Sequence, residues 1–280
     1  MYFGVTILII GCKSNKDIDA KEDINYYKLN KIKRVEQYRY DFKFGVVDSS
    51  SKELEMAFEY DTLGNEIKSI YYYKNYSLTV DTSDGKIMDS MFTIKTYDKK
   101  GNVISAISYN EVGKIDYKST TTYNENNKIV DYIQYDANGA LEYKNHNTFD
   151  DNGYWISSIS NDLKKNSEKI TTVVKRDGDI EKEVKETDDK SNLIKRDVLK
   201  VHNDTIRIYE NYDSLNKVYS KTEIKLYNKI IVGLKVIDLK TNTIDYGYLK
   251  KLNKMNLPIE ETSYSNGEPS IFYKYVYYKF

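Results

Sequence analysis

The sequence predicts an all-β protein, an antiparallel meander of hairpin repeats that forms a large curled or spiralling sheet. Three observations predict it. Apolar and aromatic residues alternate with polar ones at a period of two along most of the chain, and no long stretch keeps the helical period of 3.6. Short turn motifs recur between these segments. Tyrosine, which favours strands, supplies 29 of the 280 residues.

The turn motif is an aromatic residue, then Asp or Asn, then two variable residues, then Gly or Asn. From Tyr97 to Phe149 the aromatic positions step by 12, 14, 12 and 14 residues, a spacing that favours one hairpin strand per repeat. The chain carries seven copies, at Tyr60-Asp61…Gly64, Tyr97-Asp98…Gly101, Tyr109-Asn110…Gly113, Tyr123-Asn124…Asn127, Tyr135-Asp136…Gly139, Phe149-Asp150…Gly153 and Tyr212-Asp213…Asn216.

Each part of the motif has a physical role. An Asp or Asn side chain bonds the backbone two residues on and starts a turn, and Gly or Asn tolerates the positive φ that closes a short loop. Each turn therefore reverses the chain, and the next strand pairs antiparallel with the last. The turn-forming residues that we predict are Asp61, Gly64, Asp98, Gly101, Asn110, Gly113, Asp136, Gly139, Asp150 and Gly153.

The repeat resembles the YD-repeat family, the Rhs-type shell sequences whose unit reads Tyr-Asp-x-x-Gly-x-Leu. The match covers residues 55–160 well and 205–280 loosely, but the Arg that usually follows the Gly is replaced, for example by Asn102 and Lys114. The resemblance implies strand–turn–strand units that spiral as an extended sheet, and the chain is too short to wrap a toxin capsule.

Outside the clear copies, alternation continues at 38–44, 230–236 and 271–277. Residues 176–200 are the least regular and fit either charged strands with long turns or one short helix. Because sheets of more than about ten strands curl, split or close, closure into a barrel stays open. We expect the terminal strands to be atypical and to cap the sheet.

The N-terminus carries an uncharged apolar run, residues 1–11, that ends at the single cysteine, Cys12. A run of about ten residues is too short to span a bilayer as a helix but fits the core of a secretory signal. The residues Ile9-Ile10-Gly11-Cys12 resemble the lipobox of bacterial lipoproteins, although no Lys or Arg precedes the run. The resemblance implies cleavage before Cys12 and acylation of its sulfur. The alternative is a buried first strand with an unreactive cysteine.

These features divide the chain into three parts. Residues 1–11 are the predicted lipoprotein signal peptide, 12–31 the lipidated cysteine with a polar tether, and 32–280 a single YD-like β-repeat domain. We expect a lipid-anchored protein of the bacterial cell envelope, on the outer membrane. The abundance of Tyr, Lys, Asn and Ile is similar to that of short lipoproteins of Bacteroidota.

Signals for catalysis are sparse, and we expect no enzyme, no cofactor and no metal site. His146 and His202 lie 56 residues apart without a motif around either. The acidic pairs Asp150-Asp151 and Asp188-Asp189 could act as glycosidase carboxylates, but a turn position better explains the first pair and a solvated loop the second. The 43 basic and 43 acidic residues balance, so no global positive field attracts a nucleic acid.

The tyrosines outside the turn positions are the candidates for binding. Tyr72 and Tyr73 belong to one cluster, and Tyr275 and Tyr277 to another. Exposed tyrosine can stack on a sugar or anchor a protein partner. We therefore expect a non-enzymatic binding or structural scaffold for an unknown protein or glycan. The alternatives are a hydrolase acting on envelope glycans and an immunity protein that neutralises a toxin.

Overall fold

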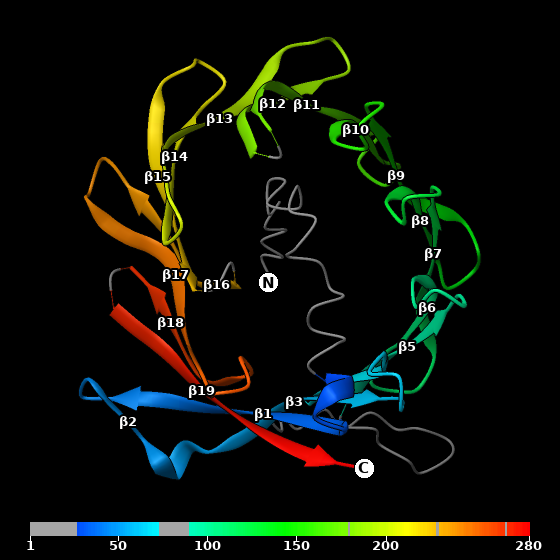
Figure 1. Cartoon of the computed structure of the whole chain (residues 1–280), viewed down its shortest axis with the longest axis vertical. Coiled ribbons are helices and arrows are strands. Elements are labelled where there is room, and N and C mark those ends of the chain that lie inside the picture. The colour runs from blue at the N-terminus through cyan, green and yellow to red at the C-terminus, as the bar shows by residue number, and fades with distance from the viewer. Residues whose placement is uncertain (1–26, 73–89, 179, 228–229, 267) are drawn as a thin grey trace.

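The computed structural model describes residues 27–72, 90–178, 180–227, 230–266 and 268–280. They form nineteen strands, and the prediction of an all-β antiparallel meander is confirmed because all strand pairs are antiparallel and, from β3 to β19, each strand pairs with the next (Figure 1). The described residues of the irregular segment, 176–178 and 180–200, form strands and turns. The strands are β1 (Ile32–Lys43), β2 (Val46–Val47), β3 (Glu53–Tyr60), β4 (Glu66–Tyr72), β5 (Ser90–Tyr97), β6 (Val103–Tyr109), β7 (Ile115–Tyr123), β8 (Ile129–Asp136), β9 (Leu141–Phe149), β10 (Trp155–Asp162), β11 (Ser167–Asp177), β12 (Ile180–Asp188), β13 (Leu193–His202), β14 (Ile206–Tyr212), β15 (Val218–Tyr227), β16 (Ile230–Asp238), β17 (Thr243–Leu252), β18 (Pro258–Ser265) and β19 (Glu268–Lys279).

The sheet closes into a barrel, so the expectation of a spiralling sheet with capping terminal strands is wrong. β1 pairs with β19 from Ile32↔Lys279 to Asp41↔Ile271, and on its other side with β3. The first and last strands thus satisfy each other's edges, which removes the open edges that a spiral would leave. Eighteen strands form the ring, and β2 pairs with the end of β1 as a short hairpin outside it. We call the β1–β19 pairing the seam.

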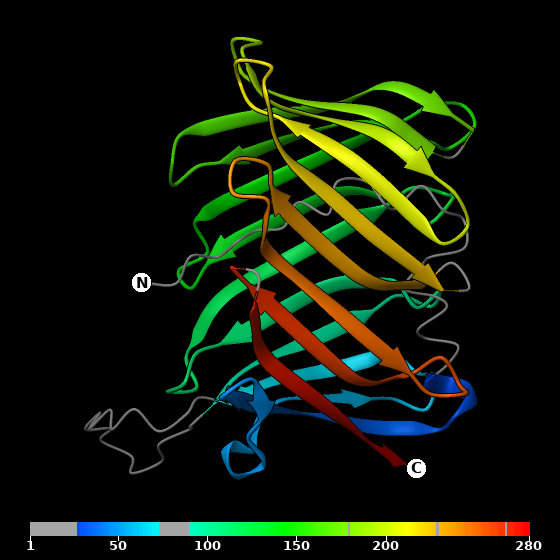
Figure 2. The same ribbon diagram turned by 90° about the vertical axis from the view of Figure 1, so that its left-hand side faces the viewer.

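The register defines an inner and an outer wall. The helical turn at 27–29 lies on the inner side of β1 in both ribbon views (Figures 1 and 2). The Tyr27 ring stacks on Tyr60, with 4.4 Å between ring centroids, and packs against a cluster that includes Val35. Val35 therefore points inward, and the pairs Val35↔Phe58 and Phe58↔Ser69 carry the inner face to the next strands. Since side chains alternate along a strand, Arg34 and Glu36 point outward.

The two ends of the barrel differ in their turns. End A is where β1 begins and β19 ends, and end B is the opposite end; the C-terminal residue marks end A in Figure 2. The β3–β4, β5–β6, β7–β8, β9–β10 and β17–β18 turns lie at end A, because successive turns of a meander alternate between the ends.

Apolar packing is local in this barrel. Ile224 and Leu226 form one small cluster of buried residues, and Ile32, Val35 and Tyr60 form another beside the seam. Many buried side chains of the inner wall are instead small and polar, such as Ser69, Ser108, Ser119, Asn211 and Ser220. The hydrogen bonds between strands and within turns therefore contribute much of the stabilisation of the barrel.

We predict that Gly139→Val lowers the melting temperature, measured by circular dichroism. Gly139 has φ +86°, and an added Cβ would meet nothing within 4 Å. The cost is therefore one of backbone conformation, about 1–2 kcal/mol or more for a β-branched residue. Asn216→Gly is the control, because φ there is +59° and glycine adopts this value readily. Equal melting temperatures for the wild type and Gly139→Val would contradict this account of the turn.

Candidate functional site

Nine turns of the barrel share one hydrogen-bond pattern. In the turn at Asp98, one carboxylate oxygen accepts from the backbone N–H of Lys100 and Asn102, both at 2.8 Å. The Asp98 N–H donates to the Asn102 carbonyl, and the Gly101 N–H donates to the Asp98 carbonyl. These bonds hold the pKa of Asp98 below its usual value, chiefly through the Asn102 backbone N–H. The nine turns begin at Asp61, Asp98, Asn110, Asn124, Asp136, Asp150, Asp188, Asp213 and Asn253.

The structure places all ten residues that we selected as turn formers in these loops, and the glycines among them have φ from +73° to +86°. The motif search missed two turns, those at Asp188 and Asn253. There the positive φ falls on Ser191 and Asn256, and the preceding residues are Thr187 and Leu252 in place of an aromatic ring. A pattern that allows any strand-forming residue before Asp or Asn finds the turn at Asn253, and finding the turn at Asp188 also requires Ser at the positive-φ position.

The tyrosine before a turn can tie it to the neighbouring strand. The Tyr123 hydroxyl donates to the carbonyl of Val103 at 2.9 Å, and Tyr97 donates in the same way to Glu66. Both acceptors lie two residues after the Gly of the preceding end-A turn. At end A the turns also touch, because the Asn102 amide donates to Asn127 Oδ1 at 3.3 Å. A shallow hollow of about 350 Å³ lies between these two turns.

The predicted ligand contacts take different positions. Tyr72 points outward and bonds Arg34, whereas Tyr275 and Tyr277 point inward and are half-buried. Their hydroxyls donate to Glu261 Oε2 at 2.9 Å and to the Pro258 carbonyl at 2.5 Å. The structure does not bring these three residues together. Tyr73 and Cys12 lie outside the described residues.

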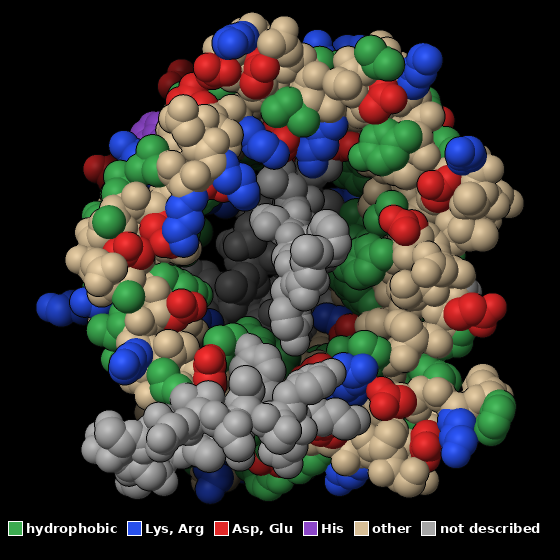
Figure 3. Space-filling view, turned by 180° about the vertical axis from the view of Figure 1, so that it is seen from behind, with side chains coloured by type: hydrophobic (Ala, Val, Ile, Leu, Met, Phe, Trp, Pro, Cys, Tyr) green, Lys and Arg blue, Asp and Glu red, His purple; other side chains and the backbone are tan. Residues whose placement is uncertain are grey.

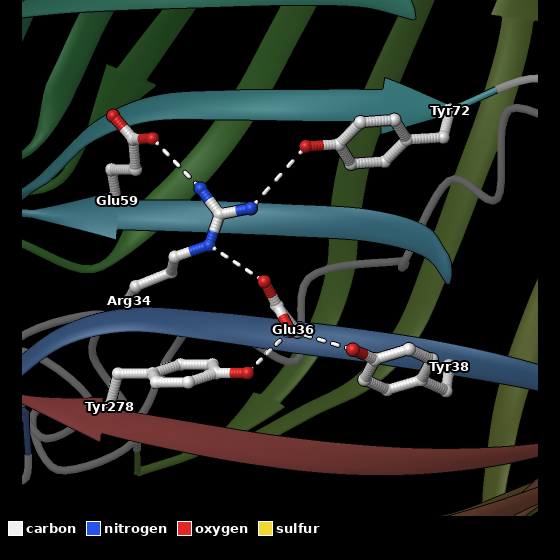
Figure 4. A network of polar contacts seen from close by, with 6 residues as sticks. All are labelled: Arg34, Glu36, Tyr38, Glu59, Tyr72 and Tyr278. Carbon is white, nitrogen blue, oxygen red and sulfur yellow. Dashed lines mark hydrogen bonds and ion pairs between the residues drawn. The ribbon is translucent and has the colours of Figure 1, made fainter. Parts of the chain in front are cut away.

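Tyr72 belongs to an outer cluster at the seam, which links β19, β1, β3 and β4 (Figure 4). Arg34 pairs with Glu36 at 2.9 Å and with Glu59 at 3.0 Å. Glu36 Oε2 also accepts from the hydroxyls of Tyr38 at 2.8 Å and Tyr278 at 2.7 Å. Partial burial raises the pKa of Glu36, but bonds from Tyr278, Tyr38 and Arg34 more than offset it and leave the pKa lowered. The bond to Glu36 in turn raises the pKa of Tyr38 to about 12.

A second polar cluster lies on the inner wall, on β11 to β15 near end B. We call it the inner-wall cluster, and the alternating register places its members, apart from Tyr219 in a β-bulge, on the same face as Ser69. Its centre is Asn211, whose amide donates to Asp197 at 2.7 Å and whose Oδ1 accepts from Ser220 at 3.1 Å. Its members are Lys169, Glu186, Lys195, Asp197, Asn211, Tyr219, Ser220 and Thr222.

Charge and burial coexist in the inner-wall cluster. Asp197 and Glu186 are each 3% exposed, and burial raises the pKa of Asp197 although Asn211 bonds it. Glu186 pairs with Lys169 at 3.0 Å and faces Lys195 at 3.8 Å. Seen from end B, basic side chains gather on the inner edge of the rim over β11–β13 (Figure 3). The lysines are the accessible charged groups of the cluster, since the side chains of Lys169 and Lys195 are 49% and 26% exposed and can donate hydrogen bonds to a ligand in the lumen.

Tyr219 gives the inner-wall cluster an aromatic surface. It is 48% exposed, and it occupies the β-bulge between Val218 and Ser220. Partial burial raises its pKa, and the charge of Asp197 contributes in the same direction. The sequence analysis missed the cluster because its members come from five strands that only the register aligns.

The candidate catalytic groups are accounted for by local contacts. His146 Nδ1 lies 2.8 Å from Asp131 Oδ1 on the outer wall, and His202 is the exposed last residue of β13. Asp150 and Asp188 each accept two backbone N–H bonds in their own turns. Among the described residues no group of His, Cys, Asp and Glu could hold a metal ion, and no helix is long and apolar enough to cross a bilayer.

Comparison with known proteins adds only distant likenesses. No family model and no curated protein matches the chain. A porin-like protein from Bacteroides uniformis matches 89% of this chain and 97% of its own length, at 8% identity and a TM-score of 0.44. The TcdB2-TccC3 structure matches 79% of this chain at 11% identity and a TM-score of 0.22, over 12% of its own length. At these values neither structure assigns a function to this chain.

We predict that Glu36→Gln lowers the free energy of unfolding at pH 7 by about 1–3 kcal/mol, because a charged acceptor of three side-chain bonds is lost. Since its folded pKa is lowered, ionised Glu36 stabilises the fold above its unfolded pKa, and this contribution disappears as the pH falls through the folded value. Urea unfolding at pH 7 and pH 3 measures the difference.

The control for this prediction is Glu168→Gln, an outward carboxylate on β11 that faces Asn161 across the strands. It should change stability by less than about 0.5 kcal/mol. Equal effects of the two substitutions at pH 7 would show that the seam cluster adds nothing beyond an exposed charge.

Proposed function

We propose that this chain is a lipid-anchored, non-enzymatic binding protein of the bacterial envelope that holds a glycan against the inner wall of its barrel. The observation that carries the proposal is the inner-wall cluster, in which the half-exposed Tyr219 directly precedes Ser220, the end of the chain of bonds from Asp197 through Asn211. An aromatic face beside amide, carboxylate and hydroxyl groups suits a sugar, whose ring stacks while its hydroxyls bond. A protein segment is the other candidate ligand.

The side chains of the outer wall favour attachment to the membrane by a lipid anchor. Outward positions in the middle of strands carry charges, among them Lys118 on β7, Lys144 on β9 and Lys185 on β12. A lysine that faces lipid at the bilayer midplane costs about 2–4 kcal/mol. The charged side chains of the outer wall thus favour contact with water over contact with lipid, and acyl chains on Cys12 would supply the attachment to the outer membrane.

The second candidate function is hydrolysis of an envelope glycan. It is favoured by Asp197, whose pKa is raised by burial and, in smaller part, by the charge of Glu186. A protonated acid near an ionised carboxylate is the arrangement that glycosidases use. Against it, Asp197 is bonded by Asn211 and Glu186 by Lys169, and both carboxylates are almost fully buried.

We predict that the producing bacterium attaches fatty acid to Cys12. Growth with an alkyne-labelled palmitate, followed by capture of the full chain, should give a labelled protein that becomes unlabelled in Cys12→Ala. A matched variant, Ser14→Ala, keeps the cysteine and should label normally. Label that persists in Cys12→Ala, or its absence from the wild type, would overturn the lipid anchor.

We predict that the full chain carrying Cys12→Ser binds oligosaccharides of the bacterial envelope on a glycan array. Tyr219→Ala and Asp197→Asn should each weaken binding about tenfold, which corresponds to ~1.4 kcal/mol. Ile94→Ser is the control, because Ile94 is 43% exposed on the outer wall.

Two results would decide against glycan binding by the inner wall. Affinity that is unchanged in both inner-wall variants would remove the ligand from this site. Mass-spectrometric detection of cleaved oligosaccharide with the wild type, lost in Asp197→Asn, would favour the hydrolase.

A further inference from the structure

Exposed apolar side chains gather at end A on both sides of the seam. Leu29 precedes β1, Phe280 follows β19, Leu63 lies in the β3–β4 turn and Met255 in the β17–β18 turn. These side chains are 77%, 57%, 57% and 40% exposed, respectively. At about 4.8 Å between strands, the arc from Leu63 to Met255 spans ~25 Å. We call this arc the seam rim.

Pairing across the seam makes the arc continuous. The Phe280 N–H donates to the Lys31 carbonyl at 2.8 Å, and the Tyr277 hydroxyl donates to the Pro258 carbonyl beside the β17–β18 turn. On the other side, the Tyr27 ring stacks on Tyr60, which directly precedes the β3–β4 turn. The four apolar residues thus lie on one continuous edge of the barrel.

Charge follows the same arc. The end-A segments of the seam rim, at 27–31, 61–65, 253–257 and 279–280, hold four lysines and one aspartate, a net side-chain charge of +3. The described turns of the opposite arc, at 124–128, 150–154, 177–178 and 203–205, hold five acidic residues and one lysine, a net charge of −4. The lysines nearest the apolar side chains are Lys28, Lys31, Lys254 and Lys279, all exposed.

We infer that the seam rim docks on an anionic lipid surface. Apolar side chains ringed by lysines match the headgroup boundary of a bilayer, where the side chains enter the apolar edge and the lysines meet lipid phosphates. The position of the proposed anchor agrees, and here the inference rests on the proposed function. Cys12 precedes Tyr27 by 15 residues, which reach at most about 50 Å, and Tyr27 lies at end A.

Four turns provide matched probes of this docking. Leu63, Met255, Asn152 and Leu215 each occupy the third position of the shared turn, the first two on the seam rim, the third on the opposite arc and the last at end B. Each is replaced singly by cysteine in the full chain carrying Cys12→Ser and labelled with the polarity-sensitive fluorophore NBD. Every sample keeps residues 1–31, so any contribution of that segment is common to all.

With vesicles of phosphatidylcholine and phosphatidylglycerol at 3:1, we expect blue-shifted, stronger emission from labels at 63 and 255, and unchanged emission at 152 and 215. Lys254→Gln with Lys279→Gln should weaken the vesicle partition coefficient about 30-fold, the equivalent of ~1 kcal/mol for each lysine. The charge control, Lys164→Gln with Lys165→Gln at end B, should leave it unchanged.

Three results would overturn the docking. The first is an equal response at all four positions, and the second a response at 215 alone. The third is a response of labels 63 and 255 to a protease-sensitive envelope extract but not to protein-free vesicles, which would assign the rim to a protein partner. Because the assay uses chains that cannot be acylated, its failure is distinct from a failure of the palmitate experiment.

Discussion

The pairing of β1 with β19 is the constraint on which the rest of the barrel depends. Every other pairing in the ring joins strands that are neighbours in sequence, whereas the seam joins residues 247 apart, Ile32 and Lys279. Closing so long a loop costs about 3 kcal/mol more than closing a hairpin of roughly 12 residues. The outer cluster around Glu36 and the inner cluster around Val35 both lie at this seam, on opposite faces of β1. Polar and apolar contacts therefore stabilise together the one step that local folding cannot supply.

Local chemistry explains why the meander could be predicted and its closure could not. An Asp side chain that accepts hydrogen bonds from the N–H groups two and four residues further on acts within its own turn. The turn-forming role of Asp61 or Asp98 can therefore be predicted from the local sequence alone. The turns at Asp188 and Asn253 are equally local and were missed because Thr187 and Leu252 stand where the motif has an aromatic residue, and because Ser191 takes the Gly or Asn position of the first turn. Closure depends instead on the register between β1 and β19, to which no motif points.

The tyrosines show how one residue type serves several positions in the fold. Tyr97 and Tyr123 donate to carbonyls of the neighbouring strand, Tyr38 and Tyr278 bond Glu36 on the outer wall, and Tyr219 occupies a β-bulge next to Ser220. Composition predicts a strand-rich chain but not this division. Whether a tyrosine faces the inner or the outer wall depends on the alternation of side chains along its strand, and a β-bulge interrupts this alternation, as at Tyr219. The candidate site could therefore not be predicted from a sequence pattern, since Glu186, Asp197 and Asn211 are brought together only by the register of three strands.

The two ends of the barrel have complementary chemistry. The seam rim at end A combines lysines with exposed Leu, Met and Phe side chains, while the inner-wall cluster lies near end B, most of a strand length away. At 3.4 Å for each residue, a strand of eight residues separates them by about 27 Å. A barrel that rests on its seam rim would hold Tyr219 and Asn211 near the mouth that faces away from the lipid. The anchor, the docking edge and the proposed ligand site then require one and the same orientation, because a barrel standing on end B would bring the inner-wall cluster against the membrane.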